Sequence, residues 1–124
     1  MNVISTTAAP AAIGPYSQAI EANGTVYVSG QLPIDPATGE FATGGIQAQA
    51  RQSLTNMKNI LAEAGLTMQN VAKVTVLLAD IADFAAVNEV YAEFFSAPFP
   101  ARSAFQVAAL PKGAGVEIEA IAVK

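Results

Sequence analysis

The chain has 124 residues, 52% hydrophobic and 13% charged, with six Lys plus Arg against ten Asp plus Glu and a formal net charge of −4. This length predicts one domain over residues 1–124 with its own core, and so few cations argue against a nucleic-acid partner. Because cysteine and histidine are absent, disulfides, catalytic thiols, thiolate metal sites and the commonest zinc ligand are excluded.

The N-terminus, residues 1–5, lacks the basic region and the long apolar core of a secretory signal, and no run approaches about 18 apolar residues. We therefore expect a cytoplasmic protein with no membrane partner. The low share of charged residues leaves some surface apolar, which favours a homo-oligomer.

Short strands are predicted at the start of the chain. Residues 2–5 form a possible strand. Residues 16–21 and 25–30 then flank Asn23-Gly24, a dipeptide that predicts a β-hairpin when it lies between apolar runs.

Residues 31–45 contain two prolines and three glycines, so we expect a loop with a tight turn at residues 37–40, which could border a site. From residue 46 the apolar positions recur at spacings of four and three, which predicts an amphipathic helix that stops at Gly65. Its apolar positions are Ile46, Ala50, Leu54, Met57, Leu61 and Ala64.

A strand and a second helix come next. Residues 71–79 are β-branched and apolar, as in a strand covered on one face and nearly covered on the other. Asp80 or Asp83 can cap the helix, which ends before Pro98. Its apolar stripe is interpreted as core, because a buried helix face requires this spacing. The stripe comprises Phe84, Val87, Tyr91 and Phe94, with Phe95 beside it.

Residues 103–109 and 115–123 predict two final strands, which makes six strands and two helices. Two helices on one face of a sheet leave the other face bare. The last strand alternates Val116, Ile118, Ala120 and Ala122 with Glu117, Glu119, Ile121 and Val123. Carboxylates on a half-apolar sheet face fit a subunit interface with a polar pocket better than a face in solvent.

Arg102 and Glu117 are the main candidates for chemistry. The guanidinium of Arg102, close behind Pro100, can hold a carboxylate through two parallel hydrogen bonds, and a carboxylate such as Glu117 can position a water molecule. The pair suggests hydrolysis of a small organic acid. Each residue also has an ordinary interpretation at the surface, and Glu119 faces the same way as Glu117.

The separation of these two residues is informative. If residues 103–109 and 115–123 formed a tight hairpin, Arg102 would lie opposite about Val123, roughly 20 Å from Glu117 at 3.3 Å per residue. Either the connection is not a tight hairpin, or the two residues meet across a subunit boundary. We favour the second alternative, which argues independently for oligomerisation.

The segments Gly14-Pro15-Tyr16-Ser17 and Val28-Ser29-Gly30-Gln31 are further candidates. Glycine lets a ligand approach backbone N–H groups, and Tyr16 can stack and donate a hydrogen bond. Each segment alone is only a turn. The sequence has no Gly-rich phosphate loop, metal-ligand cluster or nucleophile elbow.

Several motifs together resemble the signatures of the Rid family, also called the YjgF family, and they run over nearly the whole chain. These motifs are residues 11–19, 26–31, 35–39, 49–56, 99–103 and 116–123. The resemblance implies an α+β fold of the chorismate-mutase-like type, with a mixed six-stranded sheet and two helices on one face. It further implies a homotrimer with a site in each cleft between subunits.

The activity that the resemblance implies is hydrolysis of reactive 2-imino acids, released by pyridoxal-phosphate enzymes, to 2-oxo acids and ammonia, with no cofactor and no metal. Arg102 would clamp the substrate carboxylate, and Glu117 would orient or deprotonate the attacking water. Many members have cysteine at position 104, where this chain has Ala104, and the main-chain carbonyl there would hold the water. The pocket would be lined by Tyr16, Ser29, Gly30 and Asn88.

Two alternatives stay open at this point. One is a regulatory trimer that binds small carboxylates and catalyses little. Such a binder would need only Arg102, so the presence of Glu117 distinguishes the enzyme from it. The other is a ribonuclease or translation inhibitor, which the acidic balance and the lack of histidine disfavour. The preferred imine and the physiological partner enzyme are not indicated by the sequence.

Overall fold

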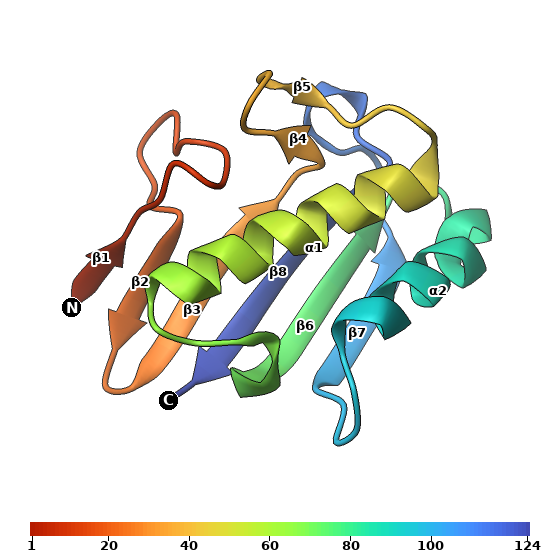
Figure 1. Ribbon diagram of the computed structural model, residues 1–124. Coiled ribbons are helices and arrows are strands. Elements are labelled where there is room, and N and C mark those ends of the chain that lie inside the picture. Colours follow the sequence, from red (N-terminus) through yellow and green to blue (C-terminus); the bar gives the residue numbers. More distant parts are fainter.

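The computed structural model describes residues 1–124 and places six strands in one sheet. These strands are β1 (Asn2–Ile4), β2 (Ala19–Ala22), β3 (Thr25–Gln31), β6 (Val71–Leu78), β7 (Ala101–Gln106) and β8 (Val116–Val123). Their order is β1-β2-β3-β8-β6-β7, and only β6 and β7 are parallel (Figure 1). The predicted mixed six-stranded sheet is confirmed.

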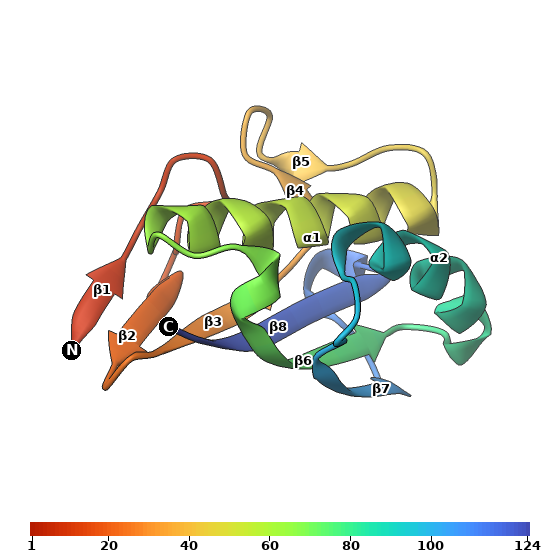
Figure 2. The ribbon, with the colours of Figure 1, turned by 60° about the horizontal axis from the view of Figure 1, so that its bottom comes forward.

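Two helices, α1 (Ile46–Glu63) and α2 (Phe84–Phe94), lie side by side on one face of this sheet. Figure 2 shows both helices on the same side, with no element covering the opposite face, which we call the bare face. Neither helix combines the length and the apolar character needed to cross a membrane. The fold is therefore two-layered, with its core between the helices and the sheet.

The core follows the predicted alternation along the strands. Val116, Ile118, Ala120 and Ala122 of β8 are buried, whereas Glu119, Ile121 and Val123 are exposed on the bare face. From the helical side, the core receives Ala50, Leu54, Met57, Ile60 and Leu61 of α1 and Val87, Val90 and Tyr91 of α2.

The hairpin at Asn23-Gly24 is confirmed, with positive φ angles of 52° and 78° that suit a two-residue turn. Strand β2 begins at Ala19, three residues later than expected. The reason is Gln18, whose buried amide bonds the N-terminal loop through Thr6 N (2.7 Å) and Pro10 O (2.8 Å). These bonds keep the chain before Ala19 out of the sheet.

Residues 31–45 are not wholly a loop, which corrects the prediction. They contain a small hairpin of β4 (Ile34–Asp35) and β5 (Glu40–Phe41). The expected turn is present, since Gly39 N donates to Asp35 O at 2.8 Å. Asn56 of α1 donates to the carbonyls of Leu32 (3.2 Å) and Ile34 (2.9 Å), and these bonds fasten the segment to the helix.

The helix ends agree with the predicted signals in part. Gly65 follows α1 with φ of 76°, and Leu66 N donates back to Leu61 O at 2.8 Å, so the helix stops as expected. Asp80 caps the short 3₁₀ helix η2 (Ile81–Asp83) through Ala82 N at 2.9 Å. The short helices η1 (Met68–Asn70) and η3 (Pro111–Gly113) precede β6 and β8.

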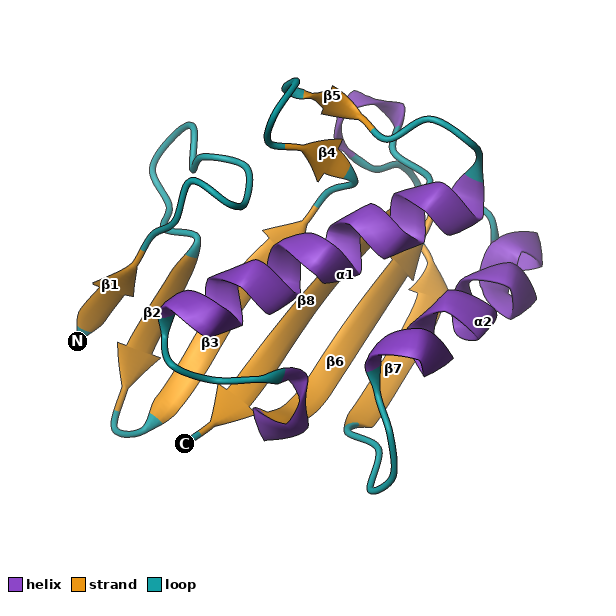
Figure 3. Cartoon of the chain, viewed as in Figure 1, coloured by secondary structure: helices purple, strands orange, loops and turns teal.

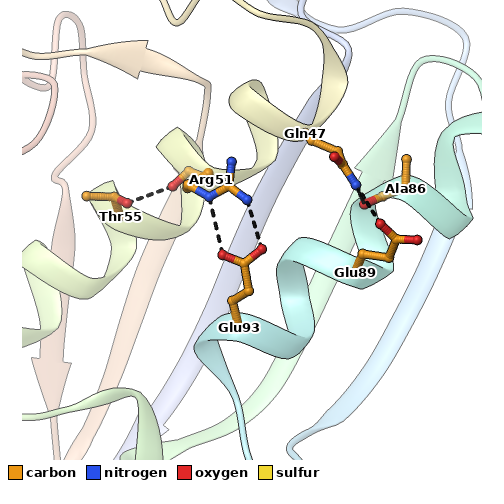
Figure 4. A network of polar contacts seen from close by, with 6 residues as sticks. All are labelled: Gln47, Arg51, Thr55, Ala86, Glu89 and Glu93. Atoms are coloured by element: carbon orange, nitrogen blue, oxygen red, sulfur yellow. Dashed lines mark hydrogen bonds and ion pairs between the residues drawn. The ribbon is translucent and has the colours of Figure 1, made fainter.

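Polar contacts join the two helices at their outer surface (Figure 4). Arg51 of α1 pairs with Glu93 of α2 at 2.8 Å, and Gln47 donates to Ala86 O at 3.1 Å and to the Glu89 carboxylate at 2.9 Å. The Arg51 pair is exposed and adds little stability. It does, however, leave Arg102 as the arginine without a carboxylate partner.

Strands β7 and β8 do not form the tight hairpin considered above. Strand β6 lies between them, parallel to β7 and antiparallel to β8 (Figure 3). The physical reason is the β6–α2–β7 unit, whose crossover helix requires β7 to run parallel to β6. The chain then passes the end of β6, where Val107 N donates to Leu78 O at 2.9 Å, and returns as β8 on the other side.

Candidate active site

Arg102 points toward α2. On the edge strand β7 it is in register with Val74, a buried residue of the helix-covered face. Its Nη1 donates to Asn88 Oδ1 at 2.6 Å, and its Cζ lies 5.2 Å from the ring centroid of Phe84 and 4.7 Å from that of Tyr91. The guanidinium is therefore held by one amide and two aromatic rings.

The helix explains this arrangement. Phe84, Asn88 and Tyr91 are four and three residues apart, so they share one face of α2. Ala104, two residues after Arg102, lies on the same side of β7 and packs partly against the core. A hollow of about 570 Å³ beside Arg102 is lined by Asn88, Glu89, Tyr91, Ala92, Phe99 and Pro100. We call Asn88, Arg102 and Ala104 the arginine half-site.

Glu117 lies on the opposite face of the sheet. It is in register with Leu77 of β6, and its carboxylate reaches across to β3, where the register with β8 shifts between Val28 and Gln31. Gly30 lies in this irregular stretch. A Cβ on Gly30 would collide with Glu117 Oε2 and lie 2.8 Å from its Cδ, so the absent side chain leaves the space that the carboxylate occupies.

Ser29 and Tyr16 complete this second group. Ser29 Oγ donates to Ser17 O at 2.6 Å and Ser29 N donates to Gln18 O at 2.9 Å, which fixes the preceding loop beside β3. Tyr16, 55% exposed, and Gly30 line a cavity of about 860 Å³ together with the N-terminal loop and residues 31–39. Part of the segment 31–45 therefore borders a cavity, and its place beside a functional site stays a prediction. We call Tyr16, Ser29, Gly30 and Glu117 the glutamate half-site.

The two half-sites are separate within one chain. Because Arg102 is in register with Val74 and Glu117 with Leu77, they lie on opposite faces, two strands and three residues apart, or roughly 10 Å in each direction. One small substrate cannot contact both residues of a single chain. A complete site with both groups requires a second chain to approach the bare face.

The electrostatics of Glu117 suit a base. Partial burial raises the pKa of Glu117 above its ordinary value of 4.5, and repulsion from Glu119 raises it further. A carboxylate with a raised pKa binds a proton more readily near neutral pH. The structure shows no group of three His, Cys, Asp or Glu side chains that could hold a metal ion.

This raised pKa predicts a pH-dependent stability. Between the ordinary and the raised pKa the folded state holds more protons than the unfolded state, so the free energy of unfolding decreases as pH rises through that window. Glu117→Gln should therefore be more stable than the unmodified protein at pH 7.5, and the difference should vanish below the ordinary pKa. Urea unfolding at pH 4 and pH 7.5 measures it, with Glu63→Gln, at the exposed end of α1, as the control. The same difference in the free energy of unfolding between Glu117→Gln and the unmodified protein at pH 4 and at pH 7.5 would contradict the prediction.

Gly30→Ala should displace the Glu117 carboxylate. The colliding atoms belong to the end of a flexible side chain, so we expect the fold to survive and catalytic turnover to fall about as far as in Glu117→Gln. A double-mutant cycle on kcat measures this. Adding Gly30→Ala to Glu117→Gln should lower kcat almost no further. If the double variant instead lost kcat by the product of the two single factors, Gly30 would act by a route other than Glu117.

From the sequence, Tyr91 and Phe84 are interpreted as core residues, and their contact with Arg102 is missed. Tyr91 is buried as predicted, and Phe84 packs partly against the core. The available signal was their spacing around Asn88, which places all three side chains on one helix face.

The chain resembles known proteins in both sequence and structure. The sequence matches the protein family described as "Endoribonuclease L-PSP" over residues 6–124. A protein of Capra hircus named "2-iminobutanoate/2-iminopropanoate deaminase" is 61% identical over 123 residues, which cover 99% of this chain and 90% of the relative.

Two solved structures are similar over their whole length. RidA from an Antarctic Psychrobacter species is 50% identical with a TM-score of 0.96, and the match covers 100% of both chains. E. coli TdcF, crystallised with bound serine, is 48% identical with a TM-score of 0.95, and the match covers 100% of this chain and 99% of the other.

Proposed function

The chain belongs to the Endoribonuclease L-PSP family, the Rid or YjgF family that its motifs resemble, and from this premise we propose that it hydrolyses 2-imino acids to 2-oxo acids and ammonia. The observation that carries the proposal is its 61% identity to a named 2-iminobutanoate/2-iminopropanoate deaminase, together with a carboxylate-free Arg102 and a Glu117 of raised pKa. The substrate class is a small 2-imino acid, and the reaction needs no cofactor.

Arg102 binds the substrate in this proposal. Asn88 occupies one N–H of its Nη1, and the remaining N–H groups of the planar guanidinium can hold a carboxylate through two parallel hydrogen bonds. The open hollow beside Arg102 gives a small acid access to these donors. The backbone of Gly30 and the side chain of Tyr16 would contact the same substrate from the glutamate half-site.

Glu117 manages protons in this proposal. It removes a proton from water as the oxygen bonds to C2 of the protonated imine, which gives a carbinolamine, and then returns that proton to the amine. As the carbon–nitrogen bond breaks, the Glu117 carboxylate takes the hydroxyl proton, the carbinolamine becomes a 2-oxo acid and ammonia departs; this last proton then passes to the ammonia, which leaves as ammonium and frees the carboxylate. Because the protonated imine is already a strong electrophile, positioning and general base catalysis are the contributions required. The Ala104 carbonyl is proposed to hold the water.

We propose a homotrimer in which the arginine half-site of one chain meets the glutamate half-site of the next. Two features support this arrangement: the separation of the half-sites, and the large apolar side chains exposed on the bare face. These side chains are Val3, Tyr27, Phe105, Ile121 and Val123. The chorismate-mutase-like type of the fold and the cytoplasmic location stay predictions.

The assembly has a direct check. Light scattering should give three times the 12.7 kDa mass of the chain. Ile121→Lys, which places a charge on the apolar bare face, should lower this mass and abolish activity together, because it removes the contact that joins the half-sites. A monomer with full activity would contradict the arrangement.

The activity is tested by generating 2-iminobutanoate with a threonine dehydratase while semicarbazide competes for the imine. The protein should increase the yield of 2-oxobutanoate in proportion to its concentration. If the protein bound 2-oxobutanoate tightly but did not change the division of the imine between hydrolysis and reaction with semicarbazide, the non-catalytic binding trimer would be favoured instead. The acidic balance, six Lys plus Arg against ten Asp plus Glu, and the absence of histidine disfavour the ribonuclease that the family description suggests.

A further inference from the structure

We propose that Phe84 and Tyr91 are positioning residues, which hold the Arg102 guanidinium in the orientation that receives the substrate carboxylate. This inference rests on the proposed function, because it assigns a role in that reaction to two residues outside the arginine half-site. We call the two rings the aromatic support.

The geometry of the aromatic support is specific. The Arg102 Cζ lies 4.7 Å from the Tyr91 centroid and 5.2 Å from the Phe84 centroid, distances at which a cation is attracted to a ring face. Tyr91 is only 6% exposed, and its ring packs on Phe95 with centroids 4.5 Å apart. The ring beneath the guanidinium is therefore itself fixed by the core.

An aromatic support solves a problem that an ion pair would create. Arg102 is exposed and its side chain is long, so without support its binding geometry would have to be ordered by the substrate. A carboxylate partner would order it, but would occupy the same N–H groups that the substrate needs. Arg51 shows that case, because Glu93 takes both its Nε and its Nη2. Aromatic rings instead attract the cation without accepting in-plane hydrogen bonds.

The hydroxyl of Tyr91 is separable from its ring. This oxygen is buried and has no hydrogen-bond partner in the chain. In our account the ring supports Arg102 and the hydroxyl contributes nothing to that support. Tyr91→Phe should therefore keep the support of Arg102, whereas Tyr91→Leu should weaken it, and this contrast separates stacking from hydrogen bonding.

Kinetics provide the first test. Tyr91→Leu and Phe84→Leu should each raise KM for 2-iminobutanoate roughly 3- to 30-fold, as expected for loss of one cation–π contact, with kcat changed much less. Tyr91→Phe should restore the original KM. Phe94→Leu, which removes a ring of the same helix without a cation–π contact to Arg102, is the matched control. Equal effects in Tyr91→Phe and Tyr91→Leu, or in Phe94→Leu and Phe84→Leu, would overturn the proposal.

A second test requires no substrate. The chain has two arginines, Arg51 and Arg102, so the ¹⁵N NMR spectrum should show two Nε–Hε signals. The signal that disappears in Arg102→Lys belongs to Arg102. In Phe84→Leu and Tyr91→Leu the Arg102 signal should lose the ring-current shift that the removed ring causes, and the order parameter of its Nε–Hε bond should fall. The Arg51 signal should not move. An unchanged Arg102 signal overturns the aromatic support even if the enzyme is active. If instead the Arg102 signal changed as expected in these variants, but the unmodified protein did not hydrolyse the imine, only the proposed function would be overturned.

Discussion

Arg102→Lys is expected to lower kcat/KM for 2-iminobutanoate by roughly 10²- to 10³-fold, although the positive charge is kept. Lysine is a compact point charge that cannot hold a carboxylate through two parallel bonds. It also cannot stack flat on Phe84 and Tyr91, so both the donor pattern and the support of the cation are lost. We expect most of the loss in KM, with a part in kcat because a loosely held substrate meets the water in fewer productive geometries.

The other arginine is the matched control for this experiment. Arg51 is exposed, pairs with Glu93 on the outer surface of the helices and lies outside both half-sites. Arg51→Lys should leave kcat and KM unchanged and should alter stability by less than about 1 kcal/mol. Steady-state rates at several imine concentrations give both constants. An Arg102→Lys enzyme within threefold of the original kcat/KM would show that the guanidinium is not the carboxylate clamp.

Glu117→Gln should reduce kcat by roughly 10²- to 10⁴-fold, the usual contribution of general acid–base catalysis. The amide keeps the shape of the side chain above Gly30 but cannot take the proton from water. Binding depends on Arg102, so KM should change little. The same substitution is expected to stabilise the folded chain at neutral pH, since burial raises the pKa of Glu117. Lower activity with higher stability in one variant is the behaviour expected of a catalytic carboxylate whose charged form is disfavoured by burial.

Glu119→Gln is the matched control. Glu119 lies two residues further along β8, faces the same side of the sheet and is more exposed than Glu117. Its loss removes one repulsive charge from Glu117, so it should shift the pH profile of kcat toward lower pH while leaving the maximal rate nearly unchanged. If Glu117→Gln retained full kcat while Glu119→Gln lost it, the assignment of the base would be wrong.

Much of the fold follows from local sequence. The Asn23-Gly24 turn, the α1 stripe and the alternation along β8 each reflect a local rule of turn geometry or side-chain period, and the structure agrees with all three. Non-local pairing was harder. Strand β8 pairs with β6 and β3 instead of its sequence neighbour β7, because the crossover through α2 takes one side of β6 and leaves the other side free.

The site could be predicted only in pieces. The structure places Asn88 against Arg102 and leaves room for Glu117 at Gly30, while the roles of these residues in binding and catalysis stay predictions. Whether Arg102 and Glu117 of the same chain can contact one substrate is decided by the faces of the sheet on which they lie. The face that Arg102 occupies depends on the β6–β7 register, which no local pattern encodes. In the proposed trimer the residues that complete each half-site lie on another chain, so no pattern within one chain places them.

The central claim is that Arg102 of one chain and Glu117 of another form one site. The direct measurement is activity of mixed oligomers made by unfolding and refolding Arg102→Ala and Glu117→Ala chains together in equal amounts. Each variant alone should be inactive. In random trimers about a quarter of the sites would combine an intact Arg102 with an intact Glu117 from the neighbouring chain, so about a quarter of the original activity should return. No recovery from fully mixed trimers, confirmed by mass spectrometry, would contradict the account.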